Sequence, residues 1–170
     1  MKKILISCCF AVSLSFANPA PFGLEINKAN YSDVINKYSS VKEVGINKYS
    51  DGKMIYINPS ELDFDGLKDT LLIFSKEDIL LAVILTLPKN KFDELYQTLK
   101  SKYKIVSKEI PFVGDKNAKF INDSTEITLN SPHMNFDLEL TYADKNLLNL
   151  YKKTKKSENE QSKEKQKSQL

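Results

Sequence analysis

Two hydrophobic periods alternate along the chain. Apolar side chains recur with the spacing of an amphipathic helix over residues 31–38, again over 92–103, and a third time from Asp144 onward. Asn30 with Asp33, and Asn90 with Asp93, predict capped starts for the first two helices. The third helix is expected to bury Leu147, Leu148 and Tyr151 and to fray into a charged tail.

The stretches between these helices are typical of strands separated by turns. Eight candidate strands are expected, over residues 41–49, 54–58, 69–75, 79–87, 104–110, 118–122, 125–130 and 135–142. Asp51-Gly52 and Gly114-Asp115 mark two of the turns. In the last strand, Phe136, Leu138, Leu140 and Tyr142 are expected to point inward and the residues between them outward.

The order of elements is therefore α-ββββ-α-ββββ-α. It predicts an α+β fold with an antiparallel sheet of about eight strands, in two α-β4 repeats over residues 22–88 and 89–143. Helices are expected to pack on one face of the sheet, which leaves the other face polar and open. We expect one domain over residues 18–151 and a disordered, charged tail over 152–170.

This tandem order resembles the β-lactamase inhibitor protein fold. The lead-in from Phe22 to Val34, Phe-Gly-Leu-Glu-Ile-Asn-Lys-Ala-Asn-Tyr-Ser-Asp-Val, is similar to the start of small outer-membrane assembly lipoprotein domains. In those domains a strand ending in Leu-Gly leads into a Thr-capped helix, whereas here Asn27 replaces the Gly and Ala29 or Asn30 the Thr. The resemblance implies a binding or assembly module.

The first 17 residues have the pattern of a cleavable signal peptide. Lys2 and Lys3 precede an uncharged stretch, and Ser15-Phe16-Ala17 places small residues where signal peptidase cleaves. We therefore expect a periplasmic or secreted protein. Leu5-Ile6-Ser7-Cys8 also matches a lipobox, but too few apolar residues precede Cys8, so a lipoprotein is disfavoured. No later segment has the length and hydropathy expected of a transmembrane helix.

Composition narrows the functional classes. Both cysteines, Cys8 and Cys9, lie in the expected signal peptide, so the remaining chain has no thiolate for a metal or a disulfide. The chain has no arginine, and residues 18–151 carry 16 lysines against 19 acidic residues. An acidic body without arginine argues against nucleic-acid and nucleotide binding. No cofactor is expected.

No catalytic or metal-binding set stands out. Glu61, Asp63, Asp65 and Asp69 match calcium-loop positions, but position 12 is Leu72 instead of Glu. His133 is the only histidine, and the loop around it is typical of a turn. Asp137 and Glu139 are expected to share a solvated strand face, where neither pKa is raised for acid catalysis. We therefore expect no catalytic or metal site.

A few large side chains are candidates for a partner-binding surface. They are Phe112 and Val113 at a hairpin tip, and Tyr49, Tyr56 and Tyr142 on the sheet. The function most consistent with these features is a non-catalytic binding or assembly protein. It would engage an envelope protein through the open sheet face or the loops. The alternatives are a carboxylate-based envelope hydrolase and a secreted enzyme inhibitor.

Overall fold

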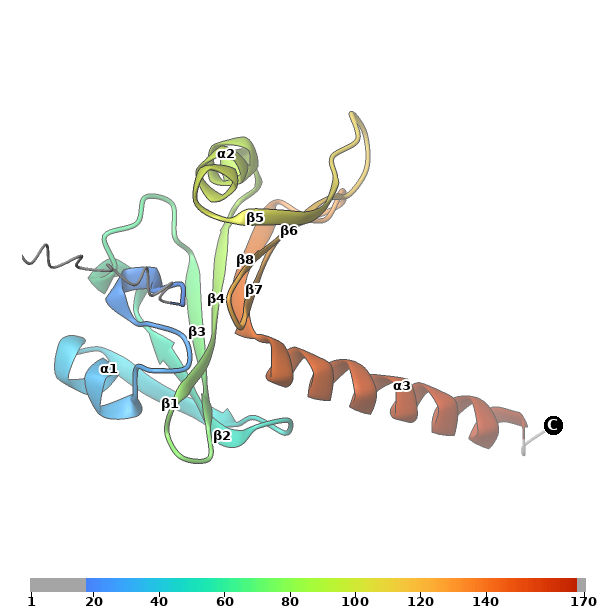
Figure 1. The fold of residues 1–170 in the computed structure, drawn as a ribbon, viewed down its shortest axis with the longest axis horizontal. Coiled ribbons are helices and arrows are strands. Elements are labelled where there is room, and N and C mark those ends of the chain that lie inside the picture. The colour runs from blue at the N-terminus through green and yellow to red at the C-terminus, as the bar shows by residue number, and fades with distance from the viewer. Residues whose placement is uncertain (1–17, 168–170) are drawn as a thin grey trace, which may run out of the picture.

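The fold is built on one antiparallel sheet, seen in the computed structural model in Figure 1. The structure describes residues 18–167, so the predicted signal peptide and Cys8 lie outside the described residues. The strands are β1 (Val41–Ile46), β2 (Asp51–Ile57), β3 (Asp69–Ser75), β4 (Leu80–Pro88), β5 (Lys104–Glu109), β6 (Lys116–Asn122), β7 (Thr125–Ser131) and β8 (Asp137–Asp144). The helices are α1 (Tyr31–Lys37), α2 (Phe92–Lys102) and α3 (Lys145–Lys167), and short 3-10 turns cover Pro21–Gly23, Pro59–Glu61 and Lys89–Lys91.

The strand order is β1-β2-β3-β4-β8-β7-β6-β5. Each half is a four-strand meander, and the two halves join along β4 and β8, which pair antiparallel from Ala82 with Ala143 to Pro88 with Asp137. The predicted α+β class and the eight-stranded antiparallel sheet are confirmed. The matching halves on either side of β4 and β8 agree with a duplication of an α-β4 unit, which stays a prediction.

The main core lies between the sheet and the first two helices. Val34 of α1 and the side of α2 that carries Phe92 and Leu99 pack with fully buried sheet residues such as Phe74 and Phe120. Burying side chains of this size stabilises the fold by roughly 1.5–3 kcal/mol each. This face is the helix-covered face that the alternating strand pattern predicts.

The helix starts differ in how they are capped. Asn30 and Asp33 form the predicted capping box, with the Asn30 side chain accepting from the Asp33 N–H at 3.0 Å. The prediction that Asn90 caps the second helix is wrong. Residues Lys89–Lys91 form a 3-10 turn, and α2 begins at Phe92. The N-cap residue is Lys91, whose side chain makes no capping hydrogen bond. The turn places Asn90 before the helix and not at its boundary.

Helix α3 departs most from the sequence-based expectation. It runs unbroken to Lys167, although we expected residues beyond 151 to be disordered or to fray. Asp144 begins it, because its carboxylate accepts from the Asn146 and Leu147 N–H groups at 2.8 and 3.1 Å. Lys, Glu and Gln are good helix formers, so the polar tail continues a helix that is already started.

The first turns of α3 also lie on the opposite side of the sheet from α1 and α2. Leu147 packs with Ile73, Ala82 and Ala143, whose side chains alternate with those of the main core and so face away from it. The rest of α3 projects away from the body (Figure 1). The open face is therefore covered at one end. None of the helices in residues 18–167 has the length and hydropathy needed to cross a bilayer.

Candidate functional site

Four large apolar side chains are exposed at one end of the second half-sheet. Phe112 is 103% exposed, Val113 66%, Met134 91% and Phe136 89%. We call this set the apolar loop end. It lies on the β5–β6 loop, which projects from the body in Figure 1, and on the β7–β8 loop. Isolated exposed apolar residues are common, but a group of four on adjoining loops is typical of an interaction site.

The two loops are adjacent because their strands are paired. Lys116, at the start of β6, pairs with Ser131, at the end of β7, so the loops before and after them leave the sheet side by side. The Asp115 carboxylate then accepts a hydrogen bond from the His133 N–H at 2.6 Å. This bond ties one loop to the other.

Lys89, which follows β4, holds the β7–β8 loop through hydrogen bonds. Its ammonium donates to the Pro132 and His133 carbonyls at 2.7 and 2.8 Å, and its backbone N–H donates to the Phe136 carbonyl at 2.9 Å. These bonds fix the backbone that presents Met134 and Phe136. A surface whose backbone is already held loses less conformational entropy when it binds a partner.

Phe136 corrects a sequence-based expectation. The alternating pattern predicted that it points into the core, but β8 begins at Asp137, opposite Pro88 at the end of β4. Phe136 lies one residue beyond this last pair, where no strand or helix of residues 18–167 covers it, and it is 89% exposed. The pattern of alternate residues is correct for Leu138, Leu140 and Tyr142 and stops where the strand pairing stops.

A second apolar surface is a groove of about 350 Å³ on the open sheet face. Ile73, Ala82, Ile84 and Ala143 contribute to its lining from the sheet, together with Leu147 and Leu148 from α3. We call it the sheet-face groove. Its volume is within the range of small-molecule sites. Glu139, which accepts a hydrogen bond from Thr141 at 2.9 Å, is its charged side chain.

Tyr49 and Tyr151 contribute aromatic rings to the same groove. They meet edge to face, with ring centroids 5.2 Å apart, and connect the β1–β2 turn to α3. Lys48, next to Tyr49, also forms an ion pair with Glu158 of α3 at 2.9 Å. These contacts hold the helix beside the groove.

The predicted tyrosines do not share one surface. Tyr49 lines the sheet-face groove, while Tyr56 pairs with Leu71 on the same face but outside the groove. Tyr142 faces the other way, toward α2, where burial raises the pKa of its hydroxyl. Phe112 and Val113 lie at the loop end, so the five candidates are divided among separate regions.

The acidic side chains singled out in the sequence are dispersed. The Glu61 carboxylate accepts from the backbone N–H groups of Ser39 and Ser40, whereas Asp65 forms an ion pair with Lys91 at 2.6 Å. Hydrogen bonds from Ser40 and Ser39 lower the pKa of Glu61. Within residues 18–167, no three His, Cys, Asp or Glu side chains are grouped as metal ligands.

The strand carboxylates are likewise engaged in surface contacts. Asp137 forms an ion pair with Lys68 at 2.5 Å, while Glu139 bonds to Thr141. The His133 backbone, not its ring, makes the contact with Asp115.

No protein-family model, curated protein or solved structure matches this chain. The resemblance to inhibitor and assembly domains therefore stays a prediction.

Proposed function

We propose that this chain is an exported, non-catalytic binding or assembly protein that engages an envelope protein through the apolar loop end. The observation that carries the proposal is the exposure of Phe112, Val113, Met134 and Phe136 on two loops that are tied together. The signal-peptide pattern of residues 1–17 supports the envelope location.

The shape of the loop end favours a protein pocket as its complement. The side chains are carried on loops that leave the end of the sheet, so they suit insertion into a hollow on a partner. Aromatic anchors that fill such pockets dominate binding energy, and removing one typically costs 2 kcal/mol or more, which is a loss of about 30-fold in affinity. Phe112 and Phe136 are the anchors we expect.

Photo-crosslinking tests this proposal. A photoreactive phenylalanine analogue at position 112 should crosslink a specific envelope protein, and an excess of unlabelled protein should compete. The same analogue at Glu77, an exposed turn position at the opposite end of the strands, is the control. Unlabelled F112S/F136S should fail to compete. Identical crosslinks from positions 112 and 77, or full competition by F112S/F136S, would contradict the proposal.

The sheet-face groove offers a second site for the same kind of function. Its ligand-sized volume and apolar sheet lining favour a peptide or ligand held on the open face. Leu148→Ser changes this groove and leaves the loop end intact. Competition that is lost with L148S and kept with F112S/F136S would place the partner in the groove.

A further inference from the structure

The outer part of α3 has no apolar side chain. Between residues 152 and 167 the helix contains only Lys, Glu, Gln, Asn, Ser and Thr. It therefore has no hydrophobic seam with which to pack on the body or on a second helix. Recognition by this segment therefore rests on its charged and polar side chains, of which lysine is the most frequent.

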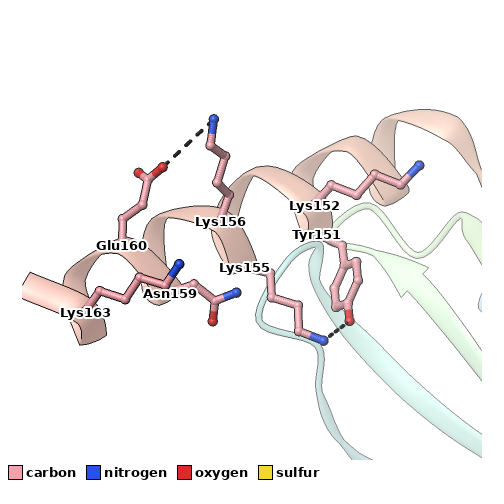
Figure 2. A pocket seen from close by; sticks show the side chains of 7 residues that line it. All are labelled: Tyr151, Lys152, Lys155, Lys156, Asn159, Glu160 and Lys163. Atoms are coloured by element: carbon pink, nitrogen blue, oxygen red, sulfur yellow. Dashed lines mark hydrogen bonds and ion pairs between the residues drawn. The ribbon is translucent and has the colours of Figure 1, made fainter. Parts of the chain in front are cut away.

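Four of the seven lysines of this segment lie along one side of the helix. At 3.6 residues per turn, Lys152, Lys156, Lys163 and Lys167 fall within an arc of about 60° and extend over about 22 Å of the helix axis. We call these four residues the basic stripe. Figure 2 shows the first three on the helix, with Lys155 turned instead toward the Tyr151 hydroxyl.

The acidic residues of α3 lie outside this arc. Glu158 points to the body, where it pairs with Lys48 at 2.9 Å. Glu160 borders the stripe and reaches Lys156 only at 3.9 Å, between side chains that are 63% and 79% exposed, so the pair is weak. Glu164 falls on the flank beyond Glu160 by the same helical count.

The basic stripe also faces away from the body. The contacts that hold α3 come from Tyr151, against Tyr49, and from Glu158, against Lys48. Both residues lie about 100° or more around the helix axis from the stripe. The helix is thus fixed at its base with its lysines turned outward.

We infer that α3 attaches the protein to an anionic lipid surface through the basic stripe. A hollow of about 480 Å³ on this part of the helix is lined by Tyr151, Asn159 and Glu160 together with Lys152, Lys156 and Lys163 (Figure 2). Lys167 lies beyond this hollow, so a flat array of phosphates is the complement that reaches all four ammonium groups together. A lysine near such a surface contributes about five-fold to affinity. This attachment is independent of the apolar loop end.

Vesicle binding by the chain from residue 18, which contains the whole described fold, tests the inference. The protein should sediment with phosphatidylglycerol-containing vesicles, much less with pure phosphatidylcholine, and not at about 1 M salt, where the Debye length is about 3 Å. Equal binding to both vesicle types, or binding that resists salt, would overturn it.

Two variants with equal charge change separate the stripe from net charge. K152Q/K163Q removes two stripe lysines and should weaken binding about 25-fold. K153Q/K165Q removes two lysines outside the stripe and should change binding less than about three-fold. Gln and Lys have similar helix propensities, and far-UV circular dichroism checks that the helix is kept. Equal losses in the two variants would overturn the inference.

Two further outcomes identify another ligand. Binding to soluble polyphosphate without binding to vesicles would replace the lipid surface by a free polyanion. Loss of vesicle binding in F112S/F136S would assign membrane contact to the apolar loop end. Either result would overturn the inference, whereas unchanged vesicle binding by F112S/F136S supports it.

Discussion

Replacing Phe136 by Ala should hardly change stability, although the alternating pattern of its strand predicts a core residue. Phe136 is 89% exposed, so it buries only about a tenth of its surface. Full burial of a Phe contributes about 1.5–3 kcal/mol, and a tenth of that is about 0.2–0.3 kcal/mol. Phe120, which is fully buried on β6, is the matched comparison. Phe120→Ala should cost about 3–5 kcal/mol, since it also leaves a cavity.

Urea unfolding followed by far-UV circular dichroism measures both values. The chain has no tryptophan, and circular dichroism reports on the sheet directly. F136A should move the midpoint only slightly at an unchanged m-value, whereas F120A should lower it strongly. A loss above about 1.5 kcal/mol for F136A would refute the reasoning, because it would mean that Phe136 is packed in the core.

Three further substitutions test how the body and α3 are held together. Asp144→Ala removes the carboxylate that begins α3 and that accepts from the Asn27 amide at 2.8 Å, so the free energy of unfolding should fall by about 1–2 kcal/mol in urea. Tyr151→Ala removes the ring pair with Tyr49, so amide hydrogen exchange should accelerate in α3 while exchange in the central strands stays the same. Because the folded-state pKa of Glu61 is lowered, its contribution is present above its unfolded-state pKa and is lost as pH falls through the folded-state value. E61Q should thus be less stable at neutral pH, with a shallower loss in acid; parallel pH curves for E61Q and the parent would contradict this.

Much of the fold could be predicted because local and tertiary signals agree. The alternation of Leu138, Leu140 and Tyr142 matches a strand with one covered face, and Asn30 with Asp33 forms the capping box that their spacing predicts. The alternation of apolar residues along the sequence does not show at which residue the pairing between two strands ends. Phe136 follows the alternation and yet lies outside the sheet, because β4 ends at Pro88.

The candidate site was only partly predictable for a related reason. Phe112 and Val113 stand at a turn that the sequence marks clearly, so they could be singled out. Met134 lies about twenty residues further on, and it joins them only because β6 pairs with β7 and Asp115 bonds to the His133 backbone. The tail was misjudged because low complexity is shared by disordered segments and by polar helices, and Asp144 decides between them as a cap.

The affinity of the crosslinked partner for the parent protein and two variants tests the central claim most directly. With the partner purified, F112A/F136A should bind at least about 100-fold more weakly, while L148S, which changes the sheet-face groove, should bind within about three-fold of the parent. Both variants should keep the circular dichroism spectrum of the parent. Unchanged affinity of F112A/F136A for that partner would contradict the account.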